Sequence, residues 1–253
     1  MAGRKTWIAR GAADEHSLRL EACFRAQELP GAGPQRMAAL TALRRLIARE
    51  ASACFGLDFP FGLPQALVEG IGWEAFITEF PERFKDAQQF RLACIRAAQG
   101  RELKRVTDLE SRTPFCGYNL RLYRQTYYGM REVLAPLVRD GLVCVLPMQP
   151  ALSGRAWLLE ICPASTLKHF GLYRPYKGRG MAQAAARQQL VAGLEQSGLR
   201  LDDTQRRAAV ADHDGDALDS LIAAWSVWRA LERPAGIAVN THPAYGCEGY
   251  VYV

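Results

Sequence analysis

Cys54-Phe-Gly-Leu-Asp58 is the stretch that decides the fold of this chain, because a short apolar run ends there in a carboxylate. A strand that is buried on both faces has such an apolar run, and Pro60 and Pro64 stop it because proline cannot donate to a strand ladder. Asp58 is therefore expected at the C-terminal end of a buried strand.

The segments on the N-terminal side of this strand predict a hairpin followed by a helix. Residues 17–26 alternate apolar and polar side chains, residues 5–10 suit a partner strand, and turn-forming residues at 11–16 separate them. Residues 34–53 carry apolar side chains at helical spacing after a proline that suits a first helical turn. We therefore expect two antiparallel strands and a helix before the buried strand.

On the C-terminal side, apolar strands alternate with helical patterns. The expected strands are 142–147, 156–162 and a final edge strand at 249–253. The expected helices are 182–197, 202–211 and 216–231. Together with a mainly helical insertion at about 65–140, this order predicts an α/β fold with a mixed sheet flanked by helices, in a single domain covering 1–253.

The composition narrows the class of protein. With 253 residues and 49% hydrophobic content, the chain is long enough for one sizeable core. The 32 Lys and Arg against 26 Asp and Glu permit an anionic partner, although proteins that bind none often have such an excess. Seven cysteines without a Cys-x-x-Cys pair favour reduced core thiols over zinc ligands or disulfides. No apolar run approaches the ~20 residues that span a bilayer, so we expect a cytoplasmic protein without a membrane partner.

Four carboxylates stand in apolar surroundings, where an ionised group is costly unless it is paired, hydrogen-bonded or bound to a metal. Asp58 ends the first buried strand, and Glu160 lies inside a later one. Asp216 and Asp219 open an apolar helix. Mg²⁺ and Mn²⁺ prefer carboxylate oxygens and retained waters, so these acids predict a hard-cation site. The chemistry typical of such clusters is phosphoryl transfer.

Each acid also has a structural interpretation. Asp58 fits an Asp-x-Pro turn. Glu160 fits an ion pair with a core arginine, or a strand-edge position that faces solvent. These interpretations need no metal.

The helical acids have two interpretations as well. On a continuous helix, the spacing of Asp212, Asp216 and Asp219 would place all three on one face. Alternatively, Asp214 caps the helix while Asp212 and Asp216 are favoured by its positive end. Asp219 lies deeper in the helix, where that effect has faded.

Five short motifs occur in order along nearly the whole chain, and they are Asp58-Phe-Pro-Phe-Gly-Leu-Pro64, Glu160-Ile-Cys-Pro163-Ala, Tyr176-Lys177-Gly178, Asp216-Ala-Leu-Asp219-Ser-Leu-Ile-Ala-Ala and Glu248-Gly-Tyr-Val-Tyr. In this order they resemble the large family called domain of unknown function 429, which is regarded as a predicted RNase H-like nuclease. The Asp-x-x-Asp helix is also similar to the last acidic element of Holliday-junction resolvases of the same superfold.

The resemblance implies an RNase H-like mixed sheet in the order 3-2-1-4-5, with metal-binding acids at the ends of the first and fourth strands and on the final helix. Asp58 would match the acid of the fourth strand, and Glu160 the acid of the following strand. Asp216 and Asp219 would match the helical pair.

The chain departs from the family at its start. Members of this kind open with a strand whose aspartate is the central metal ligand, whereas no Asp precedes Lys5 here. The first strand therefore looks missing, and a central strand is needed because both of its neighbours depend on its backbone hydrogen bonds. We expect either that Met1 is an internal or misassigned start, or that another segment such as 249–253 completes the sheet.

Two basic segments are candidates for substrate contact. Residues 118–131 interleave arginines and tyrosines, which suit phosphates and bases, although an amphipathic helix with a solvated basic face explains them more simply. A loop after the second acidic strand carries four further basic residues, Lys168, Arg174, Lys177 and Arg179. Lys177 is the preferred catalytic member because it matches the family's Tyr-Lys-Gly. His213 is the one histidine that we consider as a general base.

The leading hypothesis is a nuclease that depends on Mg²⁺ or Mn²⁺ and hydrolyses phosphodiester bonds of nucleic acid. The alternative is a non-catalytic nucleic-acid or protein-binding member of the same superfold that has lost its metal site, and the absent first aspartate favours it. Phosphotransferases such as sugar kinases share the core fold. We rank them last because no duplicated half and no Gly-rich phosphate loop accompany Asp58.

Overall fold

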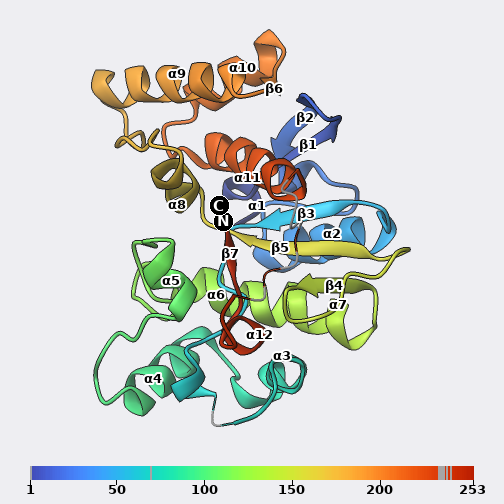
Figure 1. Ribbon diagram of the computed structural model, residues 1–253, viewed down its shortest axis with the longest axis vertical. Coiled ribbons are helices and arrows are strands. Elements are labelled where there is room, and N and C mark those ends of the chain that lie inside the picture. Colours follow the sequence, from blue (N-terminus) through green and yellow to red (C-terminus); the bar gives the residue numbers. More distant parts are fainter. Residues whose placement is uncertain (1, 69, 233–236, 238, 240) are drawn as a thin grey trace.

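Two small sheets form the centre of the computed structural model, which describes residues 2–68, 70–232, 237, 239 and 241–253 (Figure 1). One sheet has the order β1-β2-β6 and the other the order β3-β5-β4, with β7 also paired to β5. The strands are β1 (Trp7–Ala13), β2 (Leu18–Arg25), β3 (Cys54–Leu57), β4 (Val143–Leu146), β5 (Ala156–Ile161), β6 (Leu199–Arg200) and β7 (Val251–Tyr252).

Helices surround these sheets, so the fold is mixed α/β. The α-helices are α1 (Ala2–Lys5), α2 (Arg36–Arg49), α3 (Trp73–Arg83), α4 (Ala87–Ala97), α5 (Val106–Glu110), α6 (Tyr123–Gly129), α7 (Ala135–Arg139), α8 (Pro163–His169), α9 (Met181–Gln196), α10 (Asp203–Ala211), α11 (Asp216–Leu231) and α12 (Tyr245–Glu248). Short 3₁₀ turns occur at Ala26–Glu28 and Gln65–Leu67, and a π-helical turn, Met130–Leu134, joins α6 to α7.

The predicted hairpin is present. β1 and β2 pair antiparallel from Trp7 with Arg25 to Ala13 with Leu18. The alternation on which the prediction rested is visible in burial, because Leu18 and Leu20 are buried while the polar residues beside them are not. The hairpin thus packs one face inward.

The second sheet is parallel, and it brings the strand-borne acids to one edge. β3 pairs with β5 so that Leu57 lies opposite Glu160, and Asp58 follows at the next position. β4 also runs parallel to β5, so residues 147–155 carry the chain back along the sheet. Parallel strands end at the same edge of a sheet, which places Asp58 and Glu160 together.

The predicted edge strand near the C-terminus is also present. β7 pairs with β5, with Val251 opposite Glu160. It lies at the same end of β5 as the acid.

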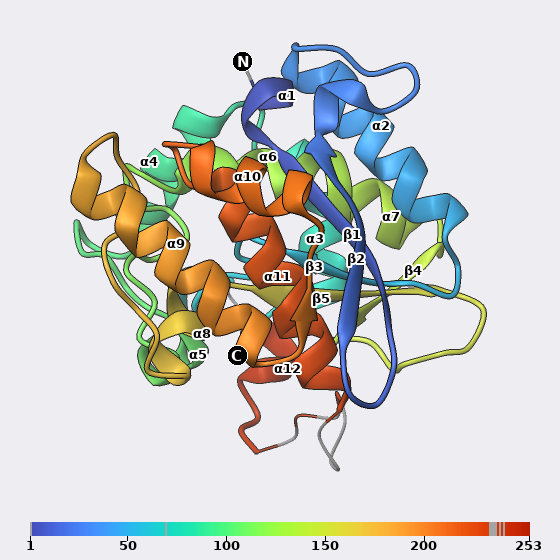
Figure 2. The ribbon, with the colours of Figure 1, turned by 90° about the horizontal axis from the view of Figure 1, so that it is seen from above.

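Helix α11 lies between the two sheets (Figures 1 and 2). It contacts β1 and β2 of one sheet and β3 and β5 of the other. Most of its apolar residues are almost fully buried, as expected for a helix covered on several sides, and they include Leu218, Leu221, Ile222, Trp225 and Trp228; Leu231 at its end is exposed. In the described chain no pairing joins β1 to β3, each of which stands at one end of its sheet order.

The segment expected to be a helical insertion contains α3 to α7 and lies below the parallel sheet in Figure 1. Its core is aromatic: Phe80 packs against Phe76, Phe84, Phe90 and Tyr127 with ring centroids 5.0 to 5.8 Å apart. This helical lobe lies on the side of the loop after β3 that faces downward in Figure 1.

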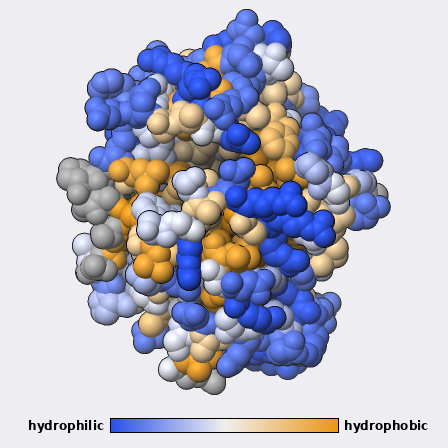
Figure 3. Space-filling model, turned by 90° about the vertical axis from the view of Figure 1, so that its right-hand side faces the viewer, coloured by the Kyte–Doolittle hydropathy of each residue, from blue (hydrophilic) through white to orange (hydrophobic). Residues whose placement is uncertain are grey.

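The face of the molecule shown in Figure 3 is mainly hydrophilic. On the face seen in Figure 3, hydrophobic residues gather toward the middle, between hydrophilic upper and lower ends. None of the helices in the described ranges is long and apolar enough to cross a membrane. All seven cysteines lie in the described residues and are free thiols.

Candidate functional site

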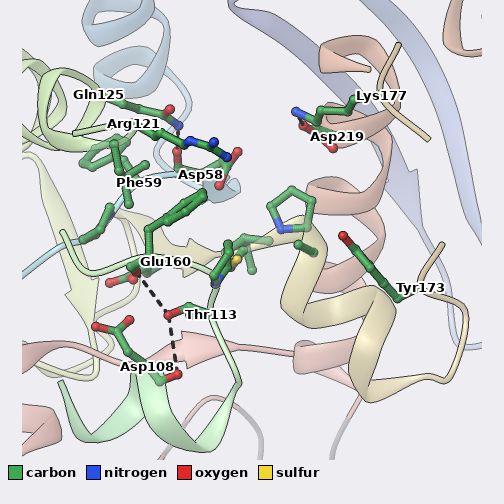
Figure 4. A pocket seen from close by; sticks show the side chains of 18 of the residues that line it. Asp58, Phe59, Asp108, Thr113, Arg121, Gln125, Glu160, Tyr173, Lys177 and Asp219 are labelled. Carbon is green, nitrogen blue, oxygen red and sulfur yellow. Dashed lines mark hydrogen bonds and ion pairs between the residues drawn. The ribbon is translucent and has the colours of Figure 1, made fainter. Parts of the chain in front are cut away.

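A pocket of about 460 Å³ opens beside the C-terminal ends of β3 and β5 and the N-terminal half of α11 (Figure 4). Asp58 and Arg121 lie on one side of it, and Lys177 and Asp219 on the other. Crevices at the carboxyl ends of parallel strands are common ligand sites. Four of the five residues that the sequence put forward as catalytic line the pocket, namely Asp58, Glu160, Lys177 and Asp219, whereas Asp216 does not.

Asp58 follows β3 directly and faces this pocket. The Gln125 side-chain amide donates to its backbone carbonyl, which ties the strand end to α6. The next residue, Phe59, fits against α6 because Gly129 has no side chain: a Cβ there would lie 2.5 Å from the Phe59 ring. The strand end is thus fixed, while the carboxylate itself remains exposed to solvent.

The surroundings of Asp58 disfavour its ionised form. Enclosure by the protein and then repulsion from Asp219, Asp216 and Glu160 raise the pKa of Asp58 to about 7, and Lys177 opposes this. Asp58 and Asp219 line opposite sides of the pocket (Figure 4), whereas Asp216 is not part of its lining.

The acids of α11 do not share one continuous helix with Asp212. Helix α10 ends at Ala211 with Asp212 as its C-cap, and Gly215 then takes a positive φ of 77° before α11 begins. The expectation that Asp214 caps the helix is wrong, because the N-cap residue is Gly215; the Asp212 carboxylate accepts from the Ala217 amide in the first turn at 2.9 Å. Asp214 instead pairs with Lys5 at the surface.

Asp219 is already paired on both oxygens. The Tyr176 hydroxyl donates to one oxygen, and the Lys177 ammonium lies 2.6 Å from the other. Lys177 also lies 3.6 Å from Asp216. One lysine therefore serves two carboxylates.

These pairings shift the titration of each group. Burial raises the pKa of Asp216 to about 6 despite Lys177, and burial also raises the pKa of Asp219. Burial opposes the charge on Lys177, but Asp219 and Asp216 outweigh it and raise the pKa of that ammonium. Burial, followed by the charge of Asp219, raises the pKa of Tyr176, so its hydroxyl stays protonated and donates.

A buried arginine holds the segment that carries Tyr176 and Lys177. The guanidinium of Arg187 donates to the carbonyls of Tyr176 at 2.6 Å and Gly178 at 2.9 Å, and also to Val210 at 2.7 Å. The missing side chain at Gly215 lets this segment approach α11, since a Cβ there would lie 2.9 Å from the Tyr176 ring. The position of Lys177 is therefore set by the fold.

Glu160 has a different environment. Its carboxylate accepts from Arg105 at 2.5 and 2.8 Å and from the Phe61 amide at 2.8 Å, and only 2% of the residue is exposed. Burial raises the pKa of Glu160, and the charge and hydrogen bonds of Arg105 oppose that effect. This is the ion pair with a core arginine that the sequence left open.

Arg105 connects this acid to two others. It pairs with Asp108 at 2.8 Å and donates to the carbonyl of Glu248 at 2.9 Å. The Glu248 carboxylate in turn accepts from the backbone amides of Gln65 and Val106. The network thus holds the loop after Asp58 against α5 and α12.

The acids do not form a closed metal cage. Across the described ranges, no three His, Cys, Asp or Glu side chains come close enough together to hold a metal ion. Asp58, Asp216 and Asp219 instead have carboxyl groups whose pKa values are raised chiefly by burial, and Lys177 opposes the shift at each of them. We refer to these three residues as the acid cluster.

Some side chains of the basic segment 118–131 make structural contacts, and others line the pocket. The tyrosines of 118–131 are mostly core residues, as the simpler interpretation predicted. Arg131 binds the carbonyls of Pro81 and Phe84, whereas Arg121 lines the pocket with its guanidinium 5.4 Å from the Phe115 ring.

The other candidates lie outside the acid cluster. Lys168 donates to the carbonyl of Arg112 at 2.7 Å, and Arg174 binds Gln189. His213 contacts Arg187 at 3.3 Å and does not line the pocket. Arg105, Arg187 and Tyr173 were not among the predicted site residues, and the only local signal for any of them was the aromatic character of Tyr173 beside the Tyr-Lys-Gly motif.

In comparisons with known proteins, the chain matches no family model, no curated protein and no solved structure. Function is therefore proposed from the pocket and its charges.

Proposed function

We propose that this protein is a divalent-metal-dependent hydrolase of phosphodiester bonds in nucleic acid, acting at the pocket beside α11. The observation that carries the proposal is the acid cluster. Asp216 and Asp219 of α11 share the single ammonium of Lys177, and burial together with repulsion from these two acids raises the pKa of Asp58. A divalent cation relieves repulsion of this kind.

The residues present fit Mg²⁺ or Mn²⁺. Mg²⁺ keeps several waters and commonly takes only one or two protein carboxylates together with substrate phosphates, so a closed cage of three side chains is not required. Asp58 and Asp219 would hold the ion, with Asp216 next to them. When bound, such an ion activates water and stabilises the leaving oxygen of a phosphodiester.

Glu160 acts indirectly in this proposal. Its oxygens are engaged by Arg105 and by the Phe61 amide, three residues beyond Asp58. It would therefore fix the position of Asp58 and add negative charge, as its effect on the pKa of Asp58 indicates.

The cations at the pocket suit a phosphate. Lys177 lies 2.6 Å from Asp219 with about half of its side chain exposed, so it can exchange that partner for a phosphate oxygen. Arg121 offers a planar guanidinium from the opposite side (Figure 4). The two would hold a strand across the acid cluster.

We also propose that the mixed α/β fold is RNase H-like. Support comes from the hairpin, the helix and β3 in that order, and from an acid at the end of β3 opposite an Asp-x-x-Asp helix start. Motifs 58–64, 160–164 and 248–252 meet around Arg105, although they lie far apart in the sequence. The strand order of the resembled family has one further strand between the two sheets. In the described chain β1 and β3 do not pair with each other, which is consistent with such a position.

The alternative, a binding protein of the same superfold without catalysis, is favoured by one specific observation. Both oxygens of Asp219 already have protein partners, Tyr176 and Lys177, so an ion must compete with an internal ammonium. A protein that has lost its metal would keep such a pair as a structural contact.

The test combines metal binding with cleavage. Calorimetric titration with Mn²⁺ and cleavage of labelled single- and double-stranded DNA and RNA would be compared for the wild type and Asp58→Asn. Loss of a ligand is expected to lower cleavage at least about 100-fold and to weaken Mn²⁺ binding at least about tenfold. Asp140→Asn, an exposed aspartate outside the pocket, is the matched control. If the wild-type protein binds no Mn²⁺ and cleaves none of the substrates, the proposed hydrolase is wrong and the non-catalytic binding protein is favoured.

A further inference from the structure

Tyr173 is the only exposed aromatic side chain of the chain, with 47% of its surface accessible. Every Trp, Phe and Tyr lies in the described residues, and all the others are buried or half-buried. Tyr173 follows α8 and extends toward the pocket that Asp58 and Asp219 line (Figure 4). A large ring left in water at a pocket contributes little to a core and is suited to stack on a ligand.

The segment that carries Tyr173 is fixed. The backbone amides of Leu172 and Tyr173 both donate to the Leu167 carbonyl, at 2.8 and 3.0 Å, which ties the segment to the end of α8. Lys168 of α8, five residues earlier, lies 5.4 Å from the Tyr173 ring centroid. The ring is therefore tied to the end of a helix, and it carries a cation on one face.

Further planar side chains line the same pocket. Phe59 and Phe115 are half-buried there, and the guanidinium of Arg121 lies 5.4 Å from the Phe115 ring centroid. Pro114 and Pro175 add apolar surface. The lining thus combines aromatic faces with positive charge, which is the combination that binds single-stranded nucleic acid.

We propose that this pocket binds one unpaired nucleobase, stacked on Tyr173, while the adjoining phosphate lies between Lys177 and Arg121. The inference rests on the proposed function and adds the substrate class to it. A pocket of about 460 Å³ has the size of a small-molecule site, so it admits one nucleotide and excludes a duplex. A base within a duplex is also stacked on its neighbours and has no free face to offer. The preferred substrate is therefore a single strand or an unpaired segment.

The experiment measures binding rather than cleavage. Fluorescence anisotropy would follow a labelled single strand of about 12 nucleotides, a strand with abasic sites throughout its middle, and the corresponding duplex. Ca²⁺ replaces Mg²⁺ so that the strands stay intact. The variants are Tyr173→Ala, Tyr173→Phe, which keeps the ring, and Leu152→Ala, an exposed apolar residue outside the pocket with 44% exposure.

We expect Tyr173→Ala to weaken binding of the intact single strand about tenfold, and Tyr173→Phe and Leu152→Ala to change it less than twofold. The abasic strand should bind weakly to the wild type and lose nothing further in Tyr173→Ala. Equal losses on intact and abasic strands, unchanged binding in Tyr173→Ala, or tighter binding of the duplex would each overturn the base site. If Asp58-dependent cleavage persists in that case, the proposed function stands without it. Absence of binding to every strand would overturn both.

Discussion

Glu160 and Asp58 end neighbouring parallel strands, and the two acids have opposite surroundings. Glu160 is buried and receives two hydrogen bonds from Arg105 and one from a backbone amide. Asp58 is exposed to the pocket and faces Asp219 and Asp216, with Lys177 as the opposing cation. The negative charge of Glu160 is therefore compensated by its hydrogen-bond donors, whereas that of Asp58 is not compensated.

The difference separates a structural role from a functional one. A buried carboxylate with a complete set of donors holds segments together, and loss of its partner is costly. Carboxylates whose repulsion exceeds their compensation lower stability in the absence of a ligand, and such groups cluster at functional sites. The following four changes test this contrast, from the largest expected effect to the smallest.

Arg105→Met should have the largest effect because it leaves Glu160 and Asp108 buried without their cation. We expect a loss of about 3 to 5 kcal/mol in the free energy of unfolding, measured by urea titration. Arg206→Met is the matched control: Arg206 also pairs with two acids, Glu195 and Asp203, but 39% of its side chain is exposed. Its loss should be much smaller, because solvent screens both of its ion pairs. Equal losses in the two variants would contradict a special role for the buried network.

Gly215→Ala tests the close approach that positions Lys177. Alanine at a φ of 77° costs about 1 to 2 kcal/mol, and its Cβ would also lie 2.9 Å from the Tyr176 ring. Gly154→Ala has a similar φ of 76° with nothing within 4 Å, so it carries the backbone cost alone. Chemical denaturation should show a larger loss for Gly215→Ala. Identical losses would mean that Tyr176 and Lys177 move aside without cost.

Asp58→Asn tests the cost of the unmatched acid through pH. The pKa of Asp58 is raised to about 7 from 3.8, so its stabilising contribution is full below about pH 3.8 and is lost as pH rises through 7. The thermal midpoint of the variant, relative to wild type, should therefore increase by a few degrees between pH 5 and pH 8 in the absence of divalent ions.

Asp14→Asn provides the control of opposite sign. The backbone amides of His16 and Ser17 lower the pKa of Asp14, so its contribution is present above 3.8 and is lost as pH falls. This variant should be less stable than wild type at pH 8 and approach it in acid. A midpoint of Asp58→Asn that follows wild type at every pH would refute the raised pKa of Asp58.

Asp214→Asn should have the smallest effect. Asp214 pairs with Lys5 at 3.3 Å, but both side chains are more than 60% exposed, so solvent screens the pair. We expect a change within about 0.5 kcal/mol in the free energy of unfolding and no change in Mn²⁺ binding. A larger change in the free energy of unfolding or in Mn²⁺ binding would mean that Asp214 belongs to the acid cluster.

The sequence predicted features that depend on near neighbours along the chain. Alternation at Leu18 and Leu20 was enough to predict the hairpin, and helical spacing was enough to predict α11. The position of Asp58 after β3 followed from the prolines beyond it. Each of these signals lies within a few residues of the feature that it predicts.

Features that depend on distant partners were not predictable. Arg105 lies 55 residues from Glu160, and nothing near either residue indicates that they meet. The break between α10 and α11 depends on the positive φ of Gly215, which the pattern of Asp212 and Asp216 concealed. The spacing of acids thus suggested one helix face where the structure has a turn.

The attachment of the loop after Asp58 has a consequence for synthesis. Its residue Gln65 is held by Glu248, 183 positions later in the sequence. At about 5 to 20 residues per second, a ribosome adds residue 248 about 10 to 40 s after residue 65. During that interval the loop lacks this hydrogen bond, so the growing chain exposes the loop to chaperones in a conformation that the finished protein does not contain. Slowing translation between these positions would prolong that exposure without changing a single residue.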